Sequence, residues 1–202
     1  MPARNGKQVR KKRQNSIRSL RSGNPMTIDQ DLETIALQEK RLQFKYFDSE
    51  LAWTLGSSLK TAAEKRNVAV AIDIQLNGHP LFFFAMPGTT PNNIDWIRRK
   101  RNVVTRFHRS SYAIGLTYER DQTTLQAKTG ADLRDFAPHG GGFPIFLEGT
   151  GCVGSITVSG LPQRADHTLI VSVLQDYFHI PPEELALDNV PQPGQKSSSQ
   201  KS

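Results

Sequence analysis

The chain has 202 residues, 37% of them hydrophobic, and a single cysteine. This length suits one domain with a core of its own, and one cysteine excludes an internal disulfide and a cysteine-based zinc cage. No apolar run approaches the length of a membrane span and no secretory signal opens the chain. We therefore expect a cytoplasmic protein without membrane contact.

The formal net charge of +7 is concentrated at one end of the chain. Residues 1–25 hold eight of the 26 Lys and Arg residues and no acid, whereas the other 18 basic residues face all 19 acidic ones. This composition predicts a disordered basic extension over residues 1–25. We expect it to be dispensable. The alternatives are an arm that binds nucleic acid or another acidic surface, a transit-like peptide, and the product of an upstream start codon.

Residues 26–180 are expected to form a single domain, followed by a disordered tail over residues 181–202 that is rich in Pro, Ser, Gln and Lys. The domain opens with helical patterns. Apolar spacing predicts one helix at residues 29–43, and Asp48 is a good N-cap for a second helix that runs to about Arg66.

Hydrophobic periodicity then drops to two, which predicts a strand at residues 68–76. The pair Asn77-Gly78 favours a type I′ hairpin into a second strand at residues 81–86. Pro80 cannot donate a ladder hydrogen bond, so it places that second strand at a sheet edge.

The second half begins with Thr90 and Pro91, the N-cap and first residue of a helix that runs to about His108 or on through residues 110–116. The remaining elements are expected in order along the chain: a weak helix at residues 131–136, an antiparallel strand pair at 143–148 and 152–158, and a last helix at 162–178. The order indicates an α+β fold, an antiparallel sheet flanked by helices.

Residues 149–154 match the dinucleotide-binding pattern G-x-G-x-x-G, but residues 155–158 predict a strand. A phosphate site of that kind needs a helix there, so we reject it in favour of a tight hairpin turn. Cys152, within this turn, is expected to be a small packing residue. No hydrolase, kinase or zinc-ligand spacing is present, and whether the protein is an enzyme stays open.

The basic run at residues 98–101 resembles a nucleic-acid patch, but four successive residues spread around a helix. Lys100 falls inside the apolar side and Arg101 at its margin. A cation on an inward face needs an anionic partner or a solvated cavity, so both are candidate ligand-binding residues. The alternatives are a snorkelling lysine, an interface ion pair, or a pairing of Lys100 with Asp73.

A second candidate is the stretch His139-Gly140-Gly141-Gly142. Consecutive glycines suit a sharp turn or a backbone that approaches a ligand closely. We predict that Lys100 and His139 share one anion-binding pocket, which requires the ammonium and the ring to lie within about 15 Å of each other.

A third candidate is the junction before the last helix, where Ser159-Gly160 leads to Arg164. A helix start beside an arginine can hold a carboxylate or a phosphate. Ordinary capping and loop geometry are the alternative for these residues and for the glycines.

Five segments form a pattern with a fixed order and spacing. They are residues 87–92, residues 95–104 with Trp-Ile-Arg-Arg-Lys-Arg, residues 109–112, residues 139–145 with His-Gly-Gly-Gly-Phe-Pro-Ile, and residues 154–167. This pattern, within a match over about residues 42–178, resembles an uncharacterised branch of the haem-degrading and haem-binding domain family, the GlcG- and HbpS-like proteins.

The resemblance implies a profilin- or PAS-like sheet with flanking helices, dimers that build larger assemblies, and binding of haem or another tetrapyrrole. His139 would be the axial ligand of the haem iron, and it is the only residue that we expect to bind a metal. Nearby cations would pair with the haem propionates. We therefore expect an oligomeric domain that binds haem or a related anionic ligand. The alternative is a non-enzymatic oligomeric scaffold or adaptor for another protein, with nucleic acid contacted, if at all, through residues 1–25.

Overall fold

The computed structural model describes residues 27–187. The basic extension predicted over residues 1–25 and most of the predicted tail lie outside the described residues. The helices are α1 (Ile28–Arg41), α2 (Ser49–Lys65), α3 (Pro91–Phe107), α4 (Ser111–Arg120), α5 (Leu125–Thr129), α6 (Gln163–Phe178) and α7 (Pro182–Leu185). The strands are β1 (Gln43–Phe44), β2 (Ala71–Leu76), β3 (His79–Ala85), β4 (Gly142–Leu147) and β5 (Gly151–Ser159).

The five strands form one sheet in the order β1-β4-β5-β2-β3. β5 pairs antiparallel with both β4 and β2, and β3 pairs antiparallel with β2. The α+β prediction is confirmed. The sheet departs from a purely antiparallel one at β1, which runs parallel to β4. With two residues, β1 has no alternation that a sequence pattern could reveal.

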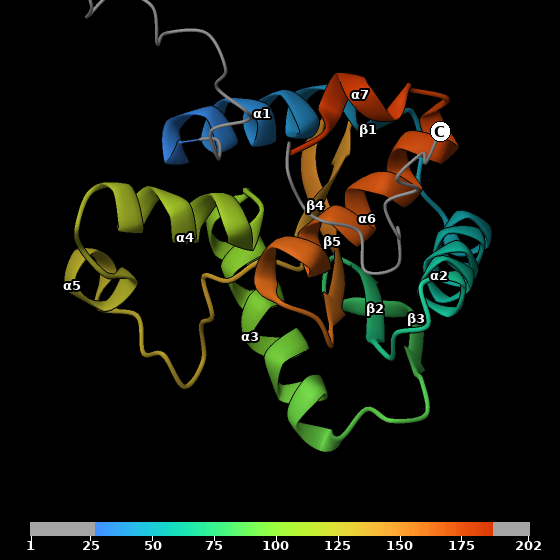
Figure 1. The fold of residues 1–202 in the computed structure, drawn as a ribbon, viewed down its shortest axis with the longest axis horizontal. Helices are drawn as coiled ribbons and strands as arrows, with labels where there is room; N and C mark the ends of the chain where they lie inside the picture. The colour runs from blue at the N-terminus through green and yellow to red at the C-terminus, as the bar shows by residue number, and fades with distance from the viewer. Residues whose placement is uncertain (1–26, 188–202) are drawn as a thin grey trace, which may run out of the picture.

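Helices cover both faces of the sheet (Figure 1). α2 and α6 pack on one face, where Ile72 and Ile74 of β2 join a core with Leu55 of α2 and Ile170 of α6. α3 packs on the opposite face, which carries Asp73 and the other alternate residues of β2. Because strand side chains alternate, β2 presents an apolar row to one helix layer and a more polar row to α3.

The predicted hairpin and sheet edge are confirmed. Asn77 and Gly78 have φ angles of +48° and +80°, as a type I′ turn requires, and β3 with its Pro80 is the edge strand. Gly56 lets α2 approach this strand, because a Cβ there would lie 2.4 Å from a ring carbon of Phe82.

The segment between α3 and β4 differs from its prediction. α3 ends at Phe107 with His108 in the left-handed conformation, and α4 is a separate helix whose N-cap is Ser110. The weak helix expected at residues 131–136 was wrong: α5 lies earlier, where the Thr124 side chain caps its first turn, and residues 133–135 form a turn. A cap decided the position of this helix where the apolar pattern was weak.

The packed region also continues past the predicted boundary at residue 180. Leu185 of α7 is fully buried, and its carbonyl accepts a hydrogen bond of 2.7 Å from Nε2 of Gln38 in α1. Gln175 of α6 donates to the carbonyls of Pro181 and Pro182. These contacts hold α7 beside α1 (Figure 1). Within residues 27–187, the structure has no helix long and apolar enough to cross a membrane.

Candidate functional site

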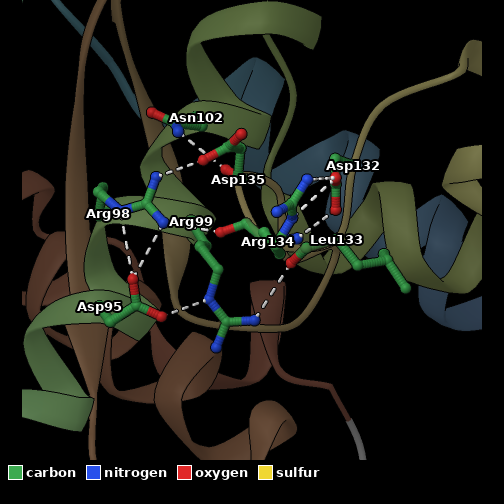
Figure 2. A network of polar contacts seen from close by, with 8 residues as sticks. All are labelled: Asp95, Arg98, Arg99, Asn102, Asp132, Leu133, Arg134 and Asp135. Carbon is green, nitrogen blue, oxygen red and sulfur yellow. Dashed lines mark hydrogen bonds and ion pairs between the residues drawn. The ribbon is translucent and has the colours of Figure 1, made fainter.

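The first two cations of the basic run tie α3 to the loop before β4 (Figure 2). Arg98 forms ion pairs with Asp95 at 3.0 Å and with Asp135 at 2.9 Å. Arg99 pairs through Nε with Asp95 at 2.8 Å and donates to the carbonyl of Leu133. Both guanidinium groups therefore have carboxylate partners in the protein, which argues against a nucleic-acid patch at this position.

Lys100 enters the interior. Its ammonium lies 2.7 Å from Oδ2 of Asp166 and 3.1 Å from the carbonyl of Val158, and the two charged residues are only 3% and 1% exposed. Burial lowers the pKa of Lys100 and raises that of Asp166 to about 6, despite their mutual attraction. The suggested pairing with Asp73 is wrong, and the enclosed ammonium has its partner in Asp166.

Arg101 is the cation that pairs with Asp73, at 2.8 Å. Asp73 is 3% exposed and also accepts a hydrogen bond of 3.1 Å from Nε2 of Gln75. Unlike Lys100, Arg101 remains partly accessible and borders a cavity of about 390 Å³.

Protein atoms occupy the space around the three glycines at residues 140–142. A Cβ at Gly140 would lie 1.8 Å from the carbonyl oxygen of Gln163, and one at Gly141 would lie 2.7 Å from Nζ of Lys100. At Gly142 it would meet the hydroxyl at the start of α4 at 2.9 Å. Gly141 also has a φ of +112°, a conformation that glycine adopts readily. The glycines thus let β4 begin against α3, α4 and α6, and the close approach is to backbone and side-chain atoms of the protein itself.

The polar groups of the third candidate region, at residues 159–164, also have partners within the protein. Arg164 forms an ion pair with Asp31 of α1 through both terminal nitrogens. The amides of Gly160 and Leu161 donate to Asp166, and Ser159 is buried. Asp166 therefore joins the end of β5 to both α6 and the ammonium of α3.

His139 is the sequence-derived candidate that faces solvent. Its ring packs edge-on against Trp96, with 5.3 Å between ring centres, and no residue of 27–187 forms a hydrogen bond with its ring nitrogens. Partial burial of the ring lowers its pKa, and the charges of Lys100 and Arg99 lower it further. The imidazole is therefore neutral at pH 7, with a nitrogen lone pair available to a metal.

Trp96 links the two residues of the predicted pocket. Its ring lies 5.3 Å from the His139 ring and 5.9 Å from the Lys100 ammonium, so the distance condition is met. The ammonium, however, is sealed behind the indole with Asp166. Arg99 is the cation closer to the surface: its guanidinium stacks on the same indole at 4.1 Å, and its side chain, paired with Asp95, is 17% exposed.

The histidine of α6 has a structural environment in the protein interior. His167 is fully buried, its Nε2 lies 2.8 Å from Oε1 of Gln38, and its Nδ1 has no partner. Burial lowers its pKa to about 3, with a further contribution from Arg164. No group of three or more His, Cys, Asp and Glu residues suited to a metal ion occurs in the described part of the chain.

The fold places the protein in a class of α+β domains with one sheet covered by helices. Several solved structures share this fold. The structure of Ybr137w is 33% identical, with a TM-score of 0.69, covering 73% of this chain and 87% of that one. Klebsiella pneumoniae protein ORFY, at 18% identity and a TM-score of 0.56, covers 69% and 94%. PduOC, solved as a complex with haem, shares the fold at 15% identity and a TM-score of 0.52, covering 59% and 86%.

The chain belongs to the family described as haem degrading protein HbpS-like, whose model matches residues 47–175. A UPF0303 protein of Azotobacter vinelandii is 60% identical over 165 residues, which are 82% of this chain and 99% of that one. A UPF0303 protein of Serratia proteamaculans is 53% identical over 153 residues, 76% and 95% of the two chains. The predicted family is confirmed.

Proposed function

We propose that the protein binds haem or a related anionic tetrapyrrole at the surface formed by Trp96, Arg99 and His139. The observation that carries the proposal is the exposed imidazole of His139, whose ring nitrogens are unused within residues 27–187 and whose pKa is lowered. Membership of the HbpS-like family and the haem complex of PduOC support the choice of ligand.

The residues present fit the chemistry of haem. A neutral imidazole is a common axial ligand of haem iron, and Trp96 offers an aromatic surface. Arg99 pairs through Nε with Asp95 and donates through Nη1 to Leu133, but its Nη2 forms no hydrogen bond within residues 27–187 and can meet a propionate. Haem would supply the iron chemistry once bound, and His139, Trp96 and Arg99 would hold and orient it.

Titration with hemin tests the proposal through the Soret band. We expect His139→Ala to weaken hemin binding at least about tenfold and to change the Soret maximum, because the axial nitrogen is lost. The matched control is His79→Ala, which removes an exposed histidine of the edge strand β3. Equal titrations for the wild type and His139→Ala would contradict the proposal.

The pH dependence gives a further expected result. Because the pKa of His139 is lowered, its neutral form persists below pH 6.5, where a free imidazole is already half protonated. Hemin affinity should therefore fall less between pH 7.5 and pH 6.5 than the roughly 1.8-fold that an unshifted pKa of 6.5 gives. A loss of about 1.8-fold or more between those two values, absent in His139→Ala, would mean that the ring titrates normally.

We also propose that the domain self-associates. The resulting assembly would bind the ligand or, as the alternative, would serve as a scaffold for another protein. Two observations support this: within residues 27–187 no strand pairs with the outer edge of β3, and Phe83 on that strand is 48% exposed. Light scattering at micromolar concentration should give at least twice the chain mass, and Phe83→Lys should lower it. Leu37→Lys, an exposed site on α1, should leave the mass unchanged; a monomeric wild type would contradict the proposal.

A further inference from the structure

A second polar site lies away from His139, at the other end of α3. The cavity of about 390 Å³ is enclosed by the last turns of α3, by the turn after β2 and by the start of β5. Its polar lining includes Gln75, Asn77, Arg101, Thr105, His108 and Ser155. The volume falls within the range of small-molecule sites in proteins.

The floor of this cavity is organised by a buried carboxylate. Asp73 lies beneath the lining, where one oxygen accepts from Nη1 of Arg101 at 2.8 Å and the other from Nε2 of Gln75 at 3.1 Å. These bonds fix both side chains before any ligand arrives, so little conformational entropy remains to be lost on binding. The other N–H groups of Arg101 form no hydrogen bond within residues 27–187.

The lining is rich in donors and contains no carboxylate. Arg101 supplies a permanent positive charge, and the amides and hydroxyls around it can donate further hydrogen bonds. The ion pair with Asp73 offsets the charge of Arg101, and the carbonyl end of α3 also opposes an anion, so recognition depends on unused donors more than on net charge. The remaining N–H groups of Arg101 and the neutral donors around it suit the oxygens of a carboxylate or phosphate group.

We propose that this cavity binds a small molecule through a carboxylate or phosphate group, with Arg101 as the residue that contacts the anion. Arg101 presents its remaining fork of N–H groups, a geometry that matches either oxyanion. Gln75 and Ser155 lie on adjacent strands as cross-strand partners and complete the polar wall. This site is independent of haem, because no lining residue is shared with the His139 surface.

Titration of ¹⁵N-labelled protein with succinate, and separately with inorganic phosphate at constant ionic strength, tests the proposal by NMR. We expect saturable shifts of the Arg101 Nε–H and of the backbone amides of Gln75 and Asn77. Thr105→Phe, which fills the cavity from an exposed position, should abolish them. Arg101→Lys keeps a cation beside Asp73 but loses the planar fork, so affinity should fall at least about fivefold.

The control variants separate a built site from general charge. Arg106→Gln removes an exposed cation of α3 that does not line the cavity, and His139→Ala removes the proposed haem ligand; both should leave succinate and phosphate binding unchanged. A response to one probe alone identifies the preferred anion. Shifts that do not saturate, or that persist in Thr105→Phe, would overturn the proposal.

Discussion

Lys100→Met is expected to destabilise the domain by about 3–5 kcal/mol, because it leaves the carboxylate of Asp166 buried without its cation. Asp166 is only 1% exposed, and its pKa is already raised to about 6. Chemical denaturation at pH 7.5 measures the loss. Had Asp166 been accessible, the same change would have cost little.

A double-mutant cycle shows whether the pair or the packing is responsible. Asp166→Asn keeps an oxygen that can accept from the amide of Leu161 and removes the charge. The double variant Lys100→Met/Asp166→Asn should therefore recover about 2 kcal/mol relative to Lys100→Met alone. The exposed control, Arg98→Met, should cost about 1 kcal/mol or less. Additive single changes, or a Lys100→Met protein as stable as wild type, would contradict this account of the pair.

His167→Gln should lower the free energy of unfolding, and this loss relative to wild type should be about 2 kcal/mol smaller at pH 5 than at pH 7. The pKa of His167 is about 3 in the folded protein, against 6.5 for the ordinary side chain. Between these values the unfolded chain binds a proton that the folded one does not, so the wild type loses stability as pH falls. Glutamine does not titrate, and the variant therefore escapes this loss.

The raised pKa of Asp166 acts in the opposite direction, because the folded protein binds its proton first between about pH 6 and 3.8. That contribution is present in wild type and variant alike, so it cancels in their difference. Ile170→Val is the control: it trims a buried side chain of the same helix and its cost should not change with pH. A cost of His167→Gln that stays constant from pH 7 to pH 5 would show that the ring protonates normally.

Most of the fold was accessible from the sequence, because local signals and tertiary packing agree there. Asp48, Thr90 and Asn77-Gly78 mark boundaries by capping or turn geometry, and the structure has them at those positions. β1 and α7 were missed because two strand residues and one helical turn carry no period of their own. Their positions depend on contacts such as that between Gln38 and Leu185.

Only the outline of the candidate site could be predicted from the sequence. The helical period placed Lys100 on an inward face, but the choice between Asp73 and Asp166 depends on how β2, β5 and α6 meet beneath α3. The glycines at 140–142 indicated close approach without indicating to what, and the structure has protein backbone there. Nothing in the sequence pattern pointed to the stacking of Arg99 on Trp96, which places a guanidinium on the indole that also contacts His139.

The most direct measurement of the proposed function follows the histidine rings themselves. Gallium(III) protoporphyrin is a diamagnetic analogue of haem, and ¹⁵N-histidine NMR resolves which imidazole coordinates the metal. We predict that the His139 ring nitrogen shifts to a metal-bound value, while His79, His108 and His179 keep their free-protein values. A metal-bound shift at another histidine, or no coordinated imidazole at saturating ligand, would contradict the assignment of His139 as the haem ligand.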